Sequence, residues 1–200
     1  MGLIEAIHGN YVFRRRVRVL SRMFANLIPE NASVLDVGCG DGSIDSLILG
    51  GRPDVRIRGV DILARKQTRI PVDLFDGKTL PFATGSFDVV LLVDVLHHSE
   101  EPAELLSETA RVSRGTILLK DHVCDGAFDR SILAFMDWVG NARHGVALPS
   151  NYWSRQQWQE AFAKAGLVND RWNAKLYLYA WPAGWIFDRS LHFMVELEKR

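Results

Sequence analysis

The strongest fold signal in the chain is the stretch Ser33-Val34-Leu35-Asp36-Val37-Gly38-Cys39-Gly40-Asp41-Gly42. Its first five residues form a short apolar run rich in β-branched side chains, which is typical of a buried parallel strand. Three alternating glycines follow, and glycine permits the positive φ angles of a tight turn. Residues 43–49 then place apolar side chains at helical spacing, up to Gly50 and Gly51. The stretch predicts a strand, a glycine turn and a helix.

The same alternation continues along the chain. Ser99 is predicted to cap a helix with Pro102 in its first turn, and Ser154 opens a capping box for a helix that Gly166 closes. The link between Asp61 and Val72 is too short and polar for a crossover helix, so we expect a loop there. Further strands are expected at 56–62, 72–75, 87–93, 116–120, 167–172 and 175–179, a first helix at 11–28, and an amphipathic tail at 187–197. This order predicts an α/β fold with a parallel, doubly wound sheet.

Length and composition favour one folded domain over residues 1–200. Apolar residues make up 48% of the 200 residues, and 24 basic residues balance 24 acidic ones. A neutral chain is an unlikely nucleic-acid binder. Within the domain we expect residues 1–30 to form an N-terminal helical cap and residues 123–153 to form a lid over the substrate.

Cysteine usage and hydropathy bear on the compartment and on metals. Cys39 and Cys124 are the two cysteines, and neither has metal-ligand spacing to another Cys or His, so we expect no metal and a reducing, cytoplasmic setting. The start has no signal-peptide pattern. The longest aliphatic run, Val89 to Val93, is far shorter than the ~20 residues of a membrane span, so no transmembrane segment is expected.

Chemistry-bearing residues follow the predicted strands at their carboxyl ends, where doubly wound sheets bind ligands. The glycine turn follows the first strand, and the next helix offers free N–H groups. Asp61 ends the second strand about 20 residues later, the separation at which an acid takes ribose hydroxyls. The later strands are followed by Asp76, by Asp94, and by Asp121 with His122. Together these residues predict a nucleoside-cofactor site.

The glycine spacing distinguishes between cofactors. Ser43 stands where the dinucleotide fingerprint G-x-G-x-x-G needs its third glycine, and no Gly-Lys-Ser/Thr phosphate loop follows. Instead, the chain resembles the class I S-adenosylmethionine-dependent methyltransferases. The motifs that carry the resemblance, over roughly residues 31–122, are Val34–Gly42, Leu80–Asp88, Val93–His98 and Glu108–Val112. It implies a Rossmann-like, mostly parallel seven-stranded sheet flanked by helices, with an antiparallel C-terminal edge strand.

The resemblance also implies a role for each matching position. S-adenosyl-L-methionine would be the cofactor and S-adenosyl-L-homocysteine the product. Asp61 would bind both ribose hydroxyls, with Ile62 against the adenine. Asp76, or more weakly Asp73, would accept from the adenine amino group, and the Gly77 N–H would reach the ring. The methionine part would be held by Asp36, by Gly38, Cys39, Gly40 and Gly42, by the Val93–Asp94 backbone, and by Tyr11 with an N-terminal arginine.

The residues that could handle protons follow the fourth and fifth strands. Asp121 and His122 form an Asp-His pair that could orient a general base, and His97 is a second candidate. The first helix carries Arg14, Arg15, Arg16, Arg18 and Arg22. These arginines form either a solvated face or a clamp for the carboxylate of a substrate or cofactor.

The expected reaction moves a methyl group to an oxygen, nitrogen or carbon of a small molecule, and an apolar or lipid-like acceptor is a candidate. Three alternatives remain at this point. The chain could methylate RNA or protein through the Arg14–Arg22 face, act as a nicotinamide-dependent oxidoreductase, or bind a cofactor without catalysis. The sequence leaves the acceptor and the oligomeric state open.

Overall fold

The computed structural model describes residues 11–141, 151–188 and 191–200. Within these ranges seven strands form one sheet, in the order β3-β2-β1-β4-β5-β7-β6. In chain order the strands are β1 Ser33–Val37, β2 Arg56–Asp61, β3 Val72–Leu74, β4 Phe87–Val93, β5 Ser113–His122, β6 Leu167–Asn173 and β7 His192–Lys199.

The strand directions confirm the predicted fold class. Every neighbouring pair from β3 to β5 is parallel. The C-terminal strand β7 is antiparallel to both β5 and β6. The sheet is therefore mostly parallel and Rossmann-like, with the antiparallel strand at one side. β7 lies one place in from the edge, and β6 is outermost.

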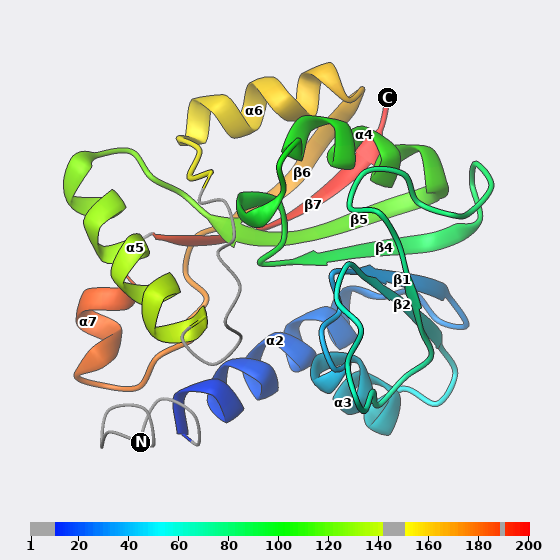
Figure 1. Ribbon diagram of the computed structural model, residues 1–200, viewed down its shortest axis with the longest axis horizontal. Coiled ribbons are helices and arrows are strands. Elements are labelled where there is room, and N and C mark those ends of the chain that lie inside the picture. The colour runs from blue at the N-terminus through cyan, green and yellow to red at the C-terminus, as the bar shows by residue number, and fades with distance from the viewer. Residues whose placement is uncertain (1–10, 142–150, 189–190) are drawn as a thin grey trace.

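Helices cover both faces of the sheet (Figure 1). The helices α4 and α6 lie over one face and α2 and α3 over the other, whereas α5 and α7 lie beyond the end of the sheet that β5 leads into. Their bounds are α2 Phe13–Leu27, α3 Ser43–Gly51, α4 Pro102–Val112, α5 Ala127–Asn141, α6 Arg155–Lys164 and α7 Ala183–Phe187, and a 3-10 turn, η2, spans Leu96–His98.

Two hydrophobic layers hold the helices on the sheet. Successive strand residues point to opposite faces, so Leu119 joins the cluster that contains Leu106 and Trp158, while Leu118 joins the cluster that contains Phe24. The parallel strands are buried on both faces, which explains their nearly continuous apolar sequence.

Several local predictions are confirmed. β1 and β4 have the predicted bounds, and residues 62–71 contain no helix. Ser154 accepts a hydrogen bond from the backbone N–H of Gln157, whose side chain accepts in turn from the Ser154 N–H, so the capping box is present.

Two predicted helix ends were wrong. Gly50 and Gly51 form the last turn of α3 instead of stopping it, and Arg52 is the C-cap. Ser99 is the C-cap of η2, while Glu101 takes the N-cap of α4 without a side-chain hydrogen bond. Pro102 fixes the first turn of α4, and its rigid φ starts the helix without a serine cap.

The predicted strand at 175–179 was also wrong. Leu176 and Leu178 are buried and Tyr177 is exposed, which gives the alternation of a strand. Tyr177 has φ of 52°, however, and the segment lies outside the sheet. The seventh strand of the sheet is β7, which overlaps the predicted amphipathic tail at residues 192–197. Both faces of β7 are covered, with Phe193 and Val195 in one cluster and Met194 in the other, so its first half is apolar without alternation.

The expected cap and lid are described in part. The structure describes residues 11–30 of the expected cap 1–30, and these residues contain α2. The expected lid 123–153 contains α5, and its residues 142–150 lie outside the described ranges. Among the described residues, no helix is long and apolar enough to cross a membrane.

Candidate functional site

The glycine turn after β1 is built by its backbone angles. Gly38, Gly40 and Gly42 have φ of 74°, 61° and 73°, a region that costs other residues roughly 1–2 kcal/mol. A Cβ at Gly38 would lie 2.6 Å from Val95, and one at Gly42 would lie 2.7 Å from Ile70. A Cβ at Gly40 would meet nothing within 4 Å. The turn is thus packed at its two ends and open at its middle, where a ligand can approach the backbone.

Asp61 ties the end of β2 to this turn. Its Oδ2 accepts from the Gly40 N–H and its Oδ1 from the Leu63 N–H, both at 2.8 Å. Because a carboxylate oxygen can accept more than one hydrogen bond, each oxygen keeps capacity for a hydroxyl. A diol bound by Asp61 would lie against the open middle of the glycine turn, so the residues present fit a nucleoside cofactor.

The residues expected at the adenine lie together beyond β2 and β3. A Cβ at Gly77 would be 3.3 Å from Ile62, whose side chain is about half exposed. Asp76 accepts the Lys78 and Thr79 N–H groups through Oδ1 alone. Asp73 instead pairs with Arg58. This geometry favours Asp76 over Asp73 as the acceptor for an adenine amino group.

Two buried carboxyl groups lie near the glycine turn, Asp36 on β1 and Asp45 on α3. Neither oxygen of Asp45, nor Oδ1 of Asp36, accepts a hydrogen bond from a described residue. Burial, and then the charge of Asp45, raises the pKa of Asp36 well above its usual value, and burial raises the pKa of Asp45 to about 6. Two buried carboxyl groups without a donor lower their repulsion by sharing one proton.

Cys39 is a packing residue in the turn. Its Sγ is so close to Gly59 that a Cβ there would come within 2.3 Å of it. Burial, followed by the charges of Asp36 and Asp45, raises the pKa of the Cys39 thiol. A thiol that stays protonated is a poor nucleophile.

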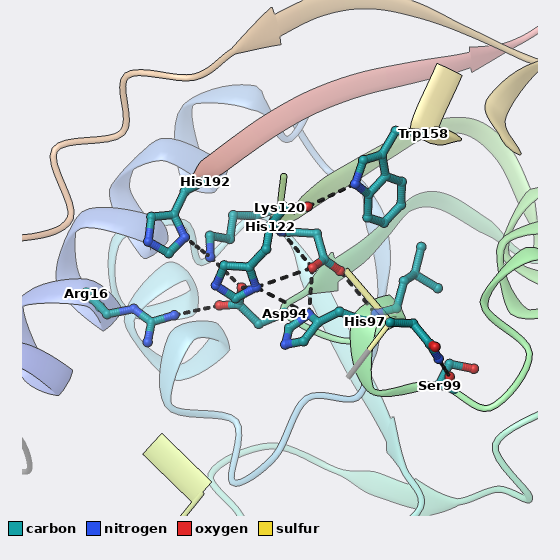
Figure 2. A network of polar contacts seen from close by, with 11 residues as sticks. Arg16, Asp94, His97, Ser99, Lys120, His122, Trp158 and His192 are labelled. Atoms are coloured by element: carbon teal, nitrogen blue, oxygen red, sulfur yellow. Dashed lines mark hydrogen bonds and ion pairs between the residues drawn. The ribbon is translucent and has the colours of Figure 1, made fainter. Parts of the chain in front are cut away.

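A second polar cluster forms where β4 and β5 end (Figure 2). His97 Nδ1 lies 2.6 Å from Asp121 Oδ1, and the backbone N–H groups of His122 and Leu96 also donate to the Asp121 carboxylate. His122 Nδ1 is 3.6 Å from that carboxylate. The Asp-His pair expected between Asp121 and His122 therefore forms between Asp121 and His97.

Asp94 is the carboxylate on the other side of His122. Asp94 has φ of 58°, so the chain turns sharply at the end of β4. Its carboxylate pairs with Lys120 and, at 2.7 Å, with Arg16 of α2. Burial acts to raise the pKa of Asp94, but the charges of Lys120 and Arg16 outweigh it and hold the pKa well below its usual value.

His122 is neutral in this setting. Burial and then the charge of Lys120 lower the pKa of His122 to about 4. The Trp158 indole N–H donates to the His122 carbonyl at 2.9 Å and fixes the backbone there. His122 therefore presents a neutral, rigidly held imidazole at the carboxyl end of β5.

Sequence reasoning missed two members of this cluster. Lys120 is fully buried and contacts Asp94 and the Nδ1 of His192, the latter at 3.1 Å. The position of Lys120 inside the apolar run of β5 is a signal that could have identified it from the sequence. His192 had no such signal, because pairing with β5 brings it opposite His122.

The outlying candidates are placed as follows. Tyr11 is 61% exposed, and Arg16 is the arginine of α2 seen to reach the strand ends. The backbone of Val93 lies where β4 ends, next to Asp94. The contacts described above do not join Tyr11 to the cluster, so its role stays a prediction.

The cluster also bears on the expectation of no metal. Ligand atoms of Asp94, His97, Asp121 and His122 lie within 4.8 Å of one another. Lys120 and Arg16 already compensate Asp94, and three N–H donors compensate Asp121. The protein itself balances these charges, and the absence of a metal stays a prediction.

Known proteins match this chain in sequence and in fold. A family model described as a methyltransferase domain matches residues 8–171. The 2-methyl-6-phytyl-1,4-hydroquinone methyltransferase of Synechocystis is 30% identical over 138 residues, 64% of this chain and 38% of that protein. Ajmaline N-methyltransferase of Rauvolfia serpentina is 29% identical over 106 residues, 46% of this chain and 36% of that protein.

The chain thus spans less than half the length of these curated relatives. Among solved structures, an S-adenosylmethionine-dependent methyltransferase from Thermotoga maritima superimposes with a TM-score of 0.66 at 16% identity. The superposition covers 98% of each chain. At that identity the likeness concerns the fold.

Proposed function

The chain belongs to the methyltransferase-domain family, and on that premise we propose that it transfers a methyl group to a small molecule. Family membership implies S-adenosyl-L-methionine as the cofactor. The observation that carries the proposal is the hydrogen bond from Gly40, at the open middle of the glycine turn, to Asp61. This bond holds a ribose acceptor and an approachable backbone side by side.

The proposed cofactor contacts follow the order of the strands. Asp36, Gly38, Cys39, Gly40 and Gly42 line the methionine part together with the backbone of Val93 and Asp94. Asp61 binds the ribose hydroxyls. Ile62 packs on the adenine, and Asp76 and the Gly77 N–H bind its polar edge. Tyr11, just before α2, reaches the methionine carboxylate.

The proposed proton handling uses His122, Asp121 and His97. When bound, S-adenosylmethionine supplies an electrophilic methyl group to the acceptor. Nδ1 of His122 lies 3.5 Å from His97 Nδ1 and 3.6 and 3.8 Å from the carboxylates of Asp121 and Asp94. Because Nδ1 faces these partners, Nε2 is the nitrogen proposed to keep the lone pair. Nε2 of the neutral His122 then takes the proton that the acceptor releases. Asp121 acts through His97, which it holds at 2.6 Å.

The acceptor is proposed to be small, with an apolar part. Phe128 and Phe135 of α5 and Trp185 of α7 are exposed. Both helices lie beyond the end of the sheet that β5 leads into (Figure 1). Such side chains suit an apolar ligand. Both relatives described above are named for small molecules. Residues 123–153 are proposed as a lid over the acceptor and residues 1–30 as a cap.

Calorimetric titration tests the cofactor half of this proposal. S-adenosylmethionine and S-adenosylhomocysteine are expected to bind and NADH not to bind. Asp61→Ala is expected to weaken binding about 100-fold, because two hydrogen bonds to a charged group are lost. Asp73→Ala is the matched control, since it removes an acid near the end of the next strand. Equal affinity of the two variants would refute the ribose assignment.

Turnover tests the acceptor half. An acceptor found by screening for S-adenosylhomocysteine release is expected to react ~100-fold more slowly with His122→Ala, while cofactor affinity stays the same. His98→Ala, at a neighbouring histidine, serves as the control. Undiminished turnover of His122→Ala would remove His122 from the mechanism.

A further inference from the structure

His192 is a buried residue with an unused hydrogen-bonding atom. Its side chain is 2% exposed, and Nε2 makes no hydrogen bond with any described residue. Leaving such a group unpaired costs roughly 1–3 kcal/mol. Its ring lies between Tyr179, stacked at 5.8 Å between centroids, and His122 at 4.8 Å. The ring is therefore held in place while one of its nitrogens remains available.

The contact with Lys120 assigns the hydrogen on this ring. Lys120 Nζ touches the Asp94 carboxylate and lies 3.1 Å from His192 Nδ1. An ammonium group donates and cannot accept. Nδ1 therefore accepts, and in the neutral imidazole the hydrogen is on Nε2. His192 thus presents an unpaired N–H donor.

The charges around this donor favour an anion. Lys120 Nζ lies 3.1 Å from His192 Nδ1, and Lys120 and Arg16 both contact the Asp94 carboxylate. Burial, and then the charges of Lys120, His122 and Arg16, lower the pKa of the His192 ring, and the charge of Asp94 acts in the opposite sense. Two positive charges therefore face one negative charge beside the ring. The carboxylate of Asp121 is already held by three N–H donors, from Leu96, His97 and His122.

The sheet places this donor away from the expected cofactor. β7 is three strands from β1 in the sheet, a separation of about 14 Å at the usual strand spacing. His192 lies opposite His122, the proposed proton acceptor. The Arg16–Asp94 pair forms the more open side of the cluster, with side chains 23% and 20% exposed. We therefore expect an anion to enter on this side, where Arg16 is the more exposed cation and His192 lies beside the buried Lys120.

We propose that His192 Nε2–H and Arg16 bind an anionic oxygen group, a carboxylate or a phosphate, on the methyl acceptor. Lys120 is the positioning residue that sets the His192 tautomer. The assignment rests on the proposed function, because it takes the strand-end cluster as the acceptor site. It narrows the acceptor to a molecule that carries an anionic group close to its methyl-accepting atom.

The first test uses the whole chain labelled with ¹⁵N-histidine. Long-range ¹H–¹⁵N spectra are expected to show His192 as the Nε2–H tautomer. Inorganic phosphate or sodium acetate, added at constant ionic strength, is expected to shift the Nε2 resonance saturably. The anion that binds with the higher affinity identifies the anionic group. An Nδ1–H tautomer, or no saturable shift with either anion, would overturn the proposal.

Variants locate the anion. His192→Phe keeps a ring at this position without the N–H donor, and Arg16→Gln removes the positive charge. Each variant is expected to bind the preferred anion about tenfold or more weakly. Arg18→Gln removes the same charge from an exposed position of the same helix and is expected to change affinity less than twofold. Equal weakening by Arg16→Gln and Arg18→Gln would indicate general attraction and refute the site.

S-adenosylhomocysteine separates this proposal from the proposed function. The anion is expected to bind equally well with S-adenosylhomocysteine at saturation, because the cofactor's own carboxylate occupies another place. Competition between the two would show that the cluster binds the cofactor carboxylate instead and would refute the proposal. If the nucleoside fails to bind while the anion binds through His192, the proposed function fails and the anion site stands.

Discussion

Among single residues, Gly40 and Gly42 make a matched pair on one turn. Gly40→Ala puts a methyl group into open space at φ of 61°, so we expect a stability loss of about 1 kcal/mol and cofactor binding at least tenfold weaker. Gly42→Ala drives its methyl group against Ile70 and is expected to lose a further 1–3 kcal/mol or so. Urea denaturation and S-adenosylhomocysteine titration measure both effects. Parent-like affinity in Gly40→Ala would place the cofactor elsewhere.

The pair Asp36 and Asp45 predicts an unusual pH dependence. Burial raises the pKa of Asp45 to about 6 in the folded chain, above its unfolded value of about 3.9. The folded state therefore holds more protons between these values, and stability falls as pH rises through this window. Asp45→Asn is expected to flatten the dependence and to be more stable than the parent at pH 7.5 by roughly 2–3 kcal/mol.

Denaturation curves between pH 4 and 8 check that prediction. Asp41→Asn provides the control on the same turn, because hydrogen bonds from Ser43, outweighing burial, lower the pKa of Asp41. Asp41→Asn is expected to leave the fall in stability with rising pH unchanged. A parent whose stability rises steadily from pH 4 to 8 would contradict the shared proton.

At the scale of elements, α6 depends on its capping box. Ser154→Ala removes the side chain that accepts from the Gln157 N–H, which costs about 1 kcal/mol. For a chain of this length that corresponds to a fall in the melting temperature of about 2–4 °C. Gln156→Ala lies on the same helix, where its amide bonds Glu160 on the surface. A thermal melt of Gln156→Ala is expected to match the parent within 1 °C or so.

α6 also connects the core to the site. Trp158 is almost fully buried among Trp153, Phe162 and Phe193, and its indole N–H holds the His122 carbonyl. The helix therefore fixes the end of β5 from behind. The backbone of His122 is therefore fixed although its side chain lies 3.6 Å from the nearest carboxylate.

At the scale of the whole molecule, the Asp94 carboxylate joins α2, β4 and β5 through Arg16 and Lys120. Asp94→Asn leaves the buried Lys120 charge without its partner and is expected to cost about 3–5 kcal/mol. Adding Lys120→Met is expected to recover most of this loss, because neither charge then remains buried. Guanidinium denaturation of the two single variants and the double variant gives the coupling free energy.

The exposed pair of Arg58 and Asp73 is the control for that cycle. Their side chains are 52% and 39% exposed, so Asp73→Asn is expected to cost less than about 1 kcal/mol. If the stability losses of the Asp94 and Lys120 single variants simply add in the double variant, the two residues are not energetically coupled. That result would contradict the prediction that they form one buried unit.

The amino-acid sequence by itself determined the parts of this protein that depend on near neighbours. The β-branched run at 33–37, the glycines after it and the Ser154–Gln157 box fix strand, turn and helix within a few residues, because steric and hydrogen-bonding preferences act locally. The order of these elements predicts the parallel part of the sheet, and the acids at its strand ends predict the candidate cofactor site.

Tertiary structure alone decided which of these residues meet. Asp121 pairs with His97 instead of its sequence neighbour His122, and β7 brings His192 beside Lys120, 72 residues away. Such contacts depend on strand order and on burial, which set both the distances and the cost of a charge. Periodicity carries no information about the partner of a strand. The pattern at 175–179 therefore predicts a strand that the sheet does not contain, and no pattern predicts that His192 meets Lys120.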